Sequence, residues 1–356
     1  MPPAIAQPAQ APKKNSRLPA RLLGLGGRHI QAFWYVLSVI LPVILRTGKR
    51  PVIFSRFAGM GDIINSIPAA LELKKRHPGA TLIYNCDASS RCVPSMGGVT
   101  DFITSCRQIG LVSYWYGWLL AGFYSFGSDD DQFASDHQEH FLTSYARAHG
   151  VEVTGHHPEL KMDAGLSEKV AAFRDKWKLH GRPLVLIHTG PSYPVKYWPL
   201  SHWQALVQKI QQECNGQVAQ LGARAGSYSA AAVDEFATVP GAVSLINQLT
   251  LPETIALIEQ ADLLVGVDSG LLHAAVSVQT PAVGLWGPTS AKFLFLEEES
   301  KYFVTSKVSC QGCHHRLPRL HWFTNCPYDI KCMREISVDE VFQACQAAIN
   351  PPPPPA

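Results

Sequence analysis

From residue 51 onward, short apolar stretches alternate with amphipathic ones, and this alternation limits the fold more than any other feature. The apolar stretches have the length of strands and form two series, which start at PVIF (51–54) and at PLVLIH (183–188). Uninterrupted apolar runs of this length are typical of strands buried on both faces. Strands that alternate with helices form parallel sheets covered by helices. The sequence therefore predicts an α/β protein with two Rossmann-like domains.

The boundary between these domains is expected near residue 180, where an amphipathic stretch over 167–179 ends before Gly181 and Pro183. We predict an N-terminal domain over 50–165, a C-terminal domain over 180–335 and a last helix over 336–350. Capping-box patterns predict helix starts at 250–253 and 337–340. The predicted strands are 51–54, 81–85 and 101–104 in the first domain, and 183–188, 217–221, 242–246, 262–267 and 281–286 in the second.

The first 49 residues form a basic leader. Residues 1–50 carry eight of the 31 Lys and Arg and none of the 28 Asp and Glu, so the rest of the chain is mildly acidic. This distribution does not suggest a nucleic-acid-binding body, and we expect no nucleic acid as a partner. Residues 1–20 and the PPPPPA tail (351–356) have a composition typical of disorder.

The apolar stretch FWYVLSVILPVIL (33–45) within the leader allows two interpretations. It is shorter than the ~20 residues that a membrane-spanning helix needs. It could lie on an anionic membrane surface, with Trp34 at the interface and its basic flanks attracted to the headgroups, or it could be a buried helix. A cleaved signal peptide is disfavoured because no small-x-small site follows. The first interpretation predicts a peripheral protein at the cytoplasmic face of the cell membrane.

The stretch GVDSGLLHAAV (266–276) takes an apolar strand through a turn directly into a helix. Asp268, Ser269 and Gly270 lie at the turn, and His273 lies one turn into the helix. The free backbone N–H groups of a helix start bind anions, and small residues let phosphate oxygens approach the backbone. The pattern predicts a phosphate site. The alternative is that Asp268 and Ser269 only cap the helix.

A second strand end, in IHTGPSYPVKYWP (187–199), has a similar turn. Thr189 and Gly190 follow the strand, and Lys196 precedes the next helix. A lysine can hold a diphosphate as a point charge without a metal. A lysine seen alone is otherwise most often a solvated loop residue.

The stretch RFAGMGDIINSIP (56–68) follows the first predicted strand. Gly59 and Gly61 permit a tight turn beside an acceptor, and Asp62 lies at the helix start. The stretch lacks the G-x-G-x-x-G spacing, so it is a weak nucleotide signal. Asp62 is either a helix N-cap or a general base that takes the proton of an acceptor hydroxyl.

Together these three stretches resemble glycosyltransferase family 9, the lipopolysaccharide heptosyltransferase family. The resemblance rests on the Gly-x-Gly-Asp turn, Lys-x-Trp-Pro, Asp-Ser-Gly-x-x-His and the Gly-Pro-Thr of residues 287–289, in that order. It implies the glycosyltransferase-B fold, inversion of configuration and no divalent metal. It further implies that Asp62 is the base, and that the donor diphosphate is held by Lys196, Ser269 and Gly270 in a pocket lined by Thr189, Gly190, Asp268 and His273.

The resemblance predicts a glycosyltransferase that moves a heptose or another hexose-like sugar from a nucleotide-sugar donor to a lipopolysaccharide core or other lipid-linked or glycan acceptor. One departure concerns the donor: relatives that use ADP-heptose often carry an acidic residue near the donor ribose, whereas the loop 221–230 has none before Asp234. Two rival functions are a nucleotide-sugar epimerase of similar fold and a non-catalytic nucleotide-sugar-binding protein.

Four of the nine cysteines cluster near the C-terminus, with the spacing C-x2-C-x12-C-x5-C. This spacing allows a structural zinc site, although the last interval is looser than is typical. Free or partly bridged thiols are the alternative, and a cytoplasmic location disfavours disulfides. No cofactor is expected for catalysis. The cluster consists of Cys310, Cys313, Cys326 and Cys332.

Overall fold

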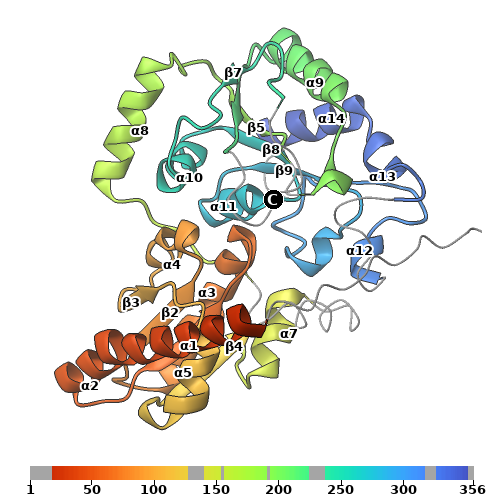
Figure 1. Ribbon diagram of the computed structural model, residues 1–356. Coiled ribbons are helices and arrows are strands. Elements are labelled where there is room, and N and C mark those ends of the chain that lie inside the picture. The colour runs from red at the N-terminus through yellow and green to blue at the C-terminus, as the bar shows by residue number, and fades with distance from the viewer. Residues whose placement is uncertain are drawn as a thin grey trace, which may run out of the picture.

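The computed structural model describes residues 18–126, 140–153, 156–190, 193–223, 237–316 and 326–351. These residues form two lobes, each built around its own parallel sheet with helices against it (Figure 1). This arrangement confirms the predicted α/β class with two Rossmann-like domains. Residues 1–17 and 352–356 of the predicted disordered termini, the acidic run 129–131 and most of the loop 221–230 lie outside the described residues.

The N-terminal lobe has a four-stranded parallel sheet in the order β3-β2-β1-β4. Both central strands are buried along their whole length, as their apolar sequence predicts. The strands are β1 (Val52–Arg56), β2 (Leu82–Cys86), β3 (Phe102–Thr104) and β4 (Gly122–Phe126). The helices of this lobe are α3 (Met60–Arg76), α4 (Cys92–Met96), α5 (Ile109–Tyr116) and α7 (Phe141–Ala148), with 3-10 turns at Ala88–Ser90 and Gly117–Leu119.

The C-terminal lobe has a six-stranded parallel sheet in the order β10-β9-β8-β5-β6-β7. Its strands are β5 (Leu184–His188), β6 (Gln217–Leu221), β7 (Val243–Ser244), β8 (Leu263–Val267), β9 (Ala282–Trp286) and β10 (Val304–Thr305). The helices are α8 (Ala164–Lys176), α9 (Leu200–Glu213), α10 (Leu251–Glu259), α11 (Gly270–Ser277), α12 (Cys313–Arg316), α13 (Lys331–Arg334) and α14 (Val338–Ile349), with 3-10 turns at Pro194–Lys196 and Ala291–Phe293. Both predicted capping boxes are present, at the starts of α10 and α14.

The leader forms a longer helix than the predicted 33–45. It consists of α1 (Leu18–Tyr35), a π-helical segment (Val36–Ile40) and α2 (Leu41–Thr47), so helix replaces predicted disorder from Leu18. One face of it is buried on the N-terminal lobe, and Tyr35 Oη lies 2.8 Å from Thr104 Oγ1. The helical run Gly26–Thr47 is also long and apolar enough to cross a membrane, a property that core helices and signal sequences share.

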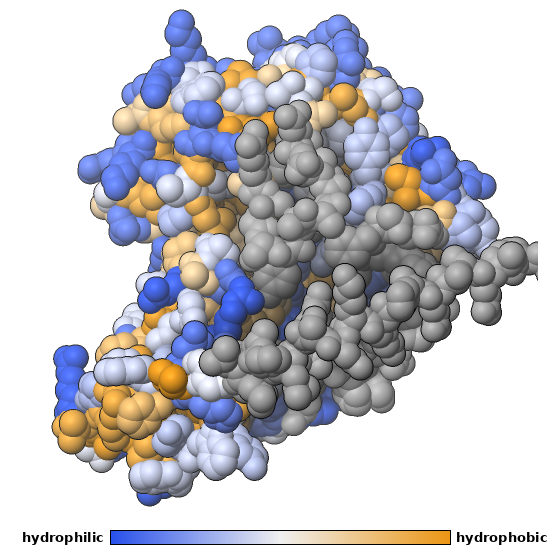
Figure 2. Space-filling model, in the orientation of Figure 1, coloured by the Kyte–Doolittle hydropathy of each residue, from blue (hydrophilic) through white to orange (hydrophobic). Residues whose placement is uncertain are grey.

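The opposite face of this leader helix carries exposed apolar side chains. Trp34 is 61% exposed, and Trp115 in α5 beside it is 55% exposed. Figure 2 shows apolar surface over the part of the lobe where α1 and α2 lie in Figure 1. The other exposed apolar residues of this face are Ile30, Phe33, Leu37 and Leu45. Tyr114 and Trp118, which are close to Trp115 in the sequence, are also exposed. The helix therefore has one buried face, as one interpretation predicted, and one exposed apolar face, while contact with a membrane stays a prediction.

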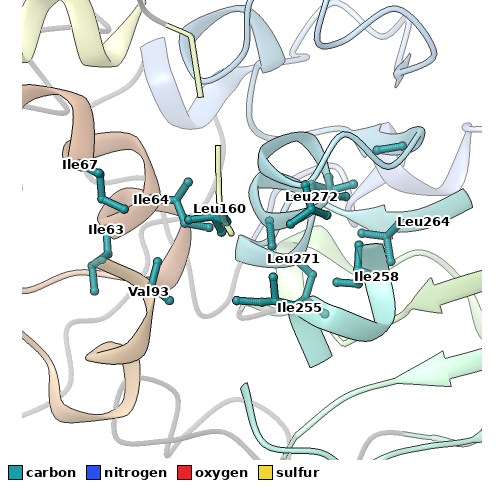
Figure 3. Close-up of a cluster of buried hydrophobic side chains, with 14 of the residues drawn as sticks. Ile63, Ile64, Ile67, Val93, Leu160, Ile255, Ile258, Leu264, Leu271 and Leu272 are labelled. Atoms are coloured by element: carbon teal, nitrogen blue, oxygen red, sulfur yellow. The ribbon is translucent and has the colours of Figure 1, made fainter. Parts of the chain in front are cut away.

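The two lobes share a hydrophobic core where α3 and α4 meet α10 and α11 (Figure 3). Ile63, Ile64 and Val93 from the first lobe lie opposite Ile255 and Leu271 from the second. Leu160, in the segment between the lobes, is buried among them, and its N–H donates to the carbonyl of Ser277 over 2.9 Å. The lobes are thus held together by an apolar contact that ends where α3 and α11 begin.

Candidate functional site

The predicted phosphate-binding turns lie on two adjacent strands of the C-terminal sheet. β5 pairs with β8. The chain continues from β5 to β6 and β7 on one side of the sheet and then crosses to β8, β9 and β10 on the other side, so the strand order reverses at β5. In open α/β sheets, ligands bind outside the carboxyl ends of the strands at such a switch point. The loops after β5 and β8 carry Thr189 to Lys196 and Asp268 to Gly270, so the fold brings these two predicted segments together.

Lys196 and Asp268 form a buried ion pair at this point. The Lys196 Nζ lies 2.7 Å from Asp268 Oδ2 and 3.5 Å from the Asp268 carbonyl oxygen, and both side chains are less than a tenth exposed. Burial opposes ionisation of Asp268, but the charge and hydrogen bond of Lys196 outweigh it and hold the pKa of the carboxyl below its usual value. Lys196 is therefore not a solvated loop lysine.

Next to this pair, the start of α11 is not capped by a side chain. Ser269 occupies the N-cap position without a side-chain cap bond, and its hydroxyl oxygen has no hydrogen-bond partner among the described residues. The capping interpretation of Asp268 and Ser269 is thus not supported. Thr189 accepts a hydrogen bond from Gln220 Nε2 over 2.8 Å, and the adjacent Gly190 is buried. An uncapped helix start beside a buried ammonium is a suitable place for an anion.

The starts of α3 and α11 touch across the two lobes. A Cβ added to Gly61 would lie 2.4 Å from Cδ2 and 2.9 Å from Nε2 of His273. A Cβ added to Gly270 would lie 3.0 Å from the Gly61 nitrogen and 2.8 Å from the end of Met60. Glycine is needed at both positions because the two helix ends could not come this close with a side chain between them.

We expect Gly61→Ala to push the two helix starts apart. The methyl group would overlap the buried His273 ring, so we expect a loss of ~1–3 kcal/mol in the free energy of unfolding, measured by chemical denaturation. Gly59→Ala is the matched control, since its Cβ would meet only Asp62 Oδ2 at an ordinary 3.4 Å. Equal stability of the two variants would contradict this close contact.

Asp62 lies in the first turn of α3, on the N-terminal side of this contact. Gly59 is the N-cap residue, so the N-cap interpretation of Asp62 is wrong. The Asp62 carboxylate is about a third exposed and lies 3.3 Å from Nη2 of Arg56, which is almost fully buried and packs over the Phe141 ring. Sequence reasoning missed Arg56, although a charged residue that ends a buried strand is a usable signal.

His273 is the end of a buried chain of polar side chains. Its Nδ1 lies 2.8 Å from His157 Nε2, and His157 Nδ1 lies 2.9 Å from Glu299 Oε2. Phe295 stacks on both imidazole rings. Sequence reasoning also missed His157 and Glu299, because 116 and 142 residues separate His157 from its two partners.

The described residues from Cys310 to Cys332, here called the cysteine segment, contact the loop that follows β9. Gln311 Nε2 donates to the Thr289 carbonyl over 2.9 Å, and Gly287 lies against Met333 and Cys332. His315 from the same segment accepts a hydrogen bond from the Ser290 N–H. Burial lowers the pKa of His315 to about 4, while the charge of Asp268 raises it and that of Lys196 lowers it. The segment therefore braces the Gly-Pro-Thr loop beside Asp268.

Cys332 lies within electrostatic reach of the other three cysteines of the predicted zinc site. Burial and the neighbouring thiols of Cys313, Cys310 and Cys326 raise the pKa of Cys332 to about 12. Across the described residues, however, no three His, Cys, Asp or Glu side chains are placed so that they could share a metal ion. A structural zinc at Cys310, Cys313, Cys326 and Cys332 stays a prediction.

The sequence model of glycosyltransferase family 9 (heptosyltransferase) matches residues 121–322, more than half of the chain. The chain belongs to glycosyltransferase family 9. The matched residues include the whole Lys196, Asp268 and His273 region, whereas Asp62 precedes them. The resemblance inferred from the sequence motifs is thereby confirmed.

Curated relatives of this family 9 chain match it at a distance. Lipopolysaccharide heptosyltransferase 1 of Pseudomonas aeruginosa is 27% identical over 161 residues, which cover 44% of this chain and 42% of the relative. Lipopolysaccharide heptosyltransferase 3 of Escherichia coli is 30% identical over 129 residues, which cover 33% and 37%. The match thus spans less than half the length of these relatives.

Solved structures show the same fold as this family 9 chain. The E. coli ADP-heptose lipopolysaccharide heptosyltransferase II superposes with a TM-score of 0.60 at 16% identity, covering 84% of this chain and 98% of that chain. The iron-containing dodecameric glycosyltransferase TibC from enterotoxigenic E. coli has a TM-score of 0.65 at 18% identity, covering 84% and 76%. The predicted glycosyltransferase-B fold is confirmed.

Proposed function

We propose that this family 9 protein is an inverting glycosyltransferase that moves a heptose or similar sugar from a nucleotide diphosphate donor to a lipopolysaccharide core or related envelope glycan. The observation that carries the proposal is the meeting of two helix starts from different lobes. One presents Asp62, and the other presents uncapped N–H groups beside the Lys196–Asp268 pair.

The donor diphosphate would lie against the start of α11. The backbone N–H groups of the helix start would attract the phosphates, and the Lys196 ammonium, although paired with Asp268, would donate a further charged hydrogen bond to them. The Ser269 hydroxyl could donate a further hydrogen bond, since it has no partner among the described residues. The name of the E. coli relative of known structure specifies ADP-heptose, and we propose a donor of this class here.

The reaction would be a single displacement without a metal. The oxygen of an acceptor hydroxyl attacks the anomeric carbon of the donor sugar, and its proton passes to the Asp62 carboxylate. The bond from that carbon to the diphosphate breaks, and its electron pair leaves with the nucleotide diphosphate. The helix start and Lys196 stabilise this group more in the transition state than in the ground state, because negative charge develops on it as it leaves.

The test is release of nucleoside diphosphate from ADP-heptose by the full chain, with and without a lipopolysaccharide extract from cells that lack core heptose. The proposal expects release that requires the extract, together with addition of one heptose to the acceptor, measured by mass spectrometry. Epimerisation of the donor without an acceptor would instead support the epimerase rival. Donor binding without any turnover would support the non-catalytic rival.

The acceptor would enter from the N-terminal lobe. A cavity of about 660 Å³ lies at the carboxyl end of that sheet, between the leader helix and the loops after β1, β2 and β3. Trp34 and Tyr35 line one side of it, and Arg91, Arg107 and Asp87 line the other. Phe57, which precedes Asp62 in the loop after β1, is also part of its wall, and we propose that a glycan held there extends toward the base.

We further propose that the exposed apolar face of the leader helix rests on the cytoplasmic surface of the cell membrane. A triple variant with Phe33→Asp, Trp34→Asp and Leu37→Asp should then lose most of its binding to phosphatidylglycerol vesicles in a flotation assay. The reason is that it places three negative charges on the face that would enter the membrane surface. Tyr328→Asp, at an equally exposed aromatic residue of the other lobe, is the control and should bind normally. Unchanged flotation of the triple variant would reject membrane contact through this face.

Removal of the whole leader is a poorer test, since it would uncover the core that Ile40 and Val43 fill.

A further inference from the structure

We propose that Glu299 and His157 are positioning residues that hold His273 with its proton on Nδ1, so that His273 Nε2 accepts a hydrogen bond from a hydroxyl group of the bound sugar. The inference rests on the proposed function for the identity of that ligand. The chain Glu299–His157–His273 itself rests on two contacts, of 2.9 Å and 2.8 Å between side-chain atoms.

The direction of the hydrogen bonds follows from the chemistry of the first group in the chain. An ionised carboxylate can only accept hydrogen bonds, so the proton of His157 lies on Nδ1, which faces Glu299. When His157 is neutral with its proton on Nδ1, its Nε2 has a lone pair and accepts, so His273 Nδ1 donates to it.

Two backbone N–H groups also hold Glu299 in place as an acceptor. Its Oε1 accepts the backbone N–H of His157 over 2.8 Å, and its Oε2 accepts that of Leu296 over 2.9 Å. Burial alone would raise the pKa of Glu299, but the side-chain bond and the charge of His157, together with these two backbone bonds, lower it to about 2. Burial also lowers the pKa of His273 well below its usual value, with the nearby His157 acting in the same direction. The remaining charged or titratable groups that face the two rings are Asp268, Lys196 and His140.

The Nε2 edge of His273 faces the start of α3. A Cβ on Gly61, the residue before Asp62, would lie within 3 Å of this edge. His273 thus lies in the first turn of α11, the helix whose start would hold the diphosphate, and its ring contacts the residue next to the proposed base. A hydroxyl group of the donor or acceptor sugar is the donor that an unprotonated Nε2 in this place would select, whereas a phosphate oxygen, which only accepts, would be repelled.

The chain offers matched control residues for a direct test. His157→Phe keeps a ring stacked on Phe295 and removes the acceptor for His273. His156→Phe alters the exposed neighbour, which lies 3.7 Å from the exposed Glu298. Glu299→Gln and Glu298→Gln form a second pair, which tests the inference even if His157→Phe folds poorly. The nitrogen shifts of 15N-labelled histidine distinguish protonated from unprotonated ring nitrogens, and His273→Asn assigns the signal.

We expect the wild type, His156→Phe and Glu298→Gln to show His273 protonated on Nδ1 at pH 8. His157→Phe and Glu299→Gln should show a mixture of tautomers or the Nε2–H form. A proton on Nε2 in the wild type, or the same tautomer in all variants, would overturn the inference.

Kinetics provide a second readout. We expect kcat of His157→Phe to fall about tenfold, the effect of one misdirected hydrogen bond in the transition state, while the dissociation constant of ADP changes less than twofold. Loss of ADP binding with an unchanged tautomer would also overturn the inference. If the wild type transfers no sugar but His273 shows the expected tautomer, the proposed function fails and the positioning by His157 and Glu299 stands.

Discussion

Lys196→Met is expected to lower the free energy of unfolding by ~3–5 kcal/mol, because it leaves the buried Asp268 carboxylate without its partner. The methionine has a similar shape, so lost packing contributes little. The same variant should lose donor binding, since the ammonium beside the start of α11 is gone. Chemical denaturation measures the first effect, and calorimetric titration with ADP measures the second.

The double variant Lys196→Met, Asp268→Leu separates these two effects. It removes both charges, so most of the lost stability should return, while ADP binding should stay weak. The pH dependence gives an independent check. The folded-state pKa of Asp268 is lowered, so the pair stabilises the protein above the unfolded pKa and this contribution is lost as the pH falls through the folded value. The double variant should lack this part of the acid dependence. A single variant as stable as the wild type, or a double variant that binds ADP normally, would contradict the assigned role of the pair.

Asp62→Asn is expected to lower kcat by ~100- to 10,000-fold and to leave the dissociation constant of ADP within about twofold of the wild-type value. An amide of the same shape cannot take the proton of the acceptor hydroxyl, and general base catalysis contributes an effect of this size. The change should lower stability by less than Lys196→Met does, because the Asp62 carboxylate is about a third exposed, although the buried Arg56 guanidinium 3.3 Å away loses the charge of this neighbour. Steady-state kinetics with ADP-heptose and the lipopolysaccharide extract would measure the first value.

Glu72→Gln on the same helix is the control for Asp62→Asn. Glu72 pairs with Lys75 on the surface at 2.8 Å, and its loss should leave kcat unchanged. If Asp62→Asn turned over at the wild-type rate, another group would have to be the base.

The sheet strands and the donor-side residues could be predicted because their signals are local. Runs such as LLVGV are apolar along their whole length, so they identify a strand buried on both faces, and the turn residues follow each strand directly. β4 (GFYSF) and β10 (VT) were not predicted, because they lack this local signal. β4 lies at the edge of its sheet with polar and glycine positions, and β10 has two residues.

The buried polar chain could not be predicted, because its members come from three distant segments. His157 lies in the segment between the lobes, Glu299 in a loop after β9, and His273 in α11, and only the packing of the two lobes brings them together. The leader was predicted too short because its apolar run was read alone, whereas the helix starts well before that run.

The apolar contact around Leu160 also determines how the enzyme can move. Pulling the lobes apart would expose Ile63, Ile64 and Leu271 to water, at roughly 2 kcal/mol for each side chain. A swivel about this contact would keep these side chains covered. We therefore expect the two lobes to rotate about the contact between α3 and α11 when nucleotide enters or leaves. The parts of the lobes farthest from Leu160 should then move most.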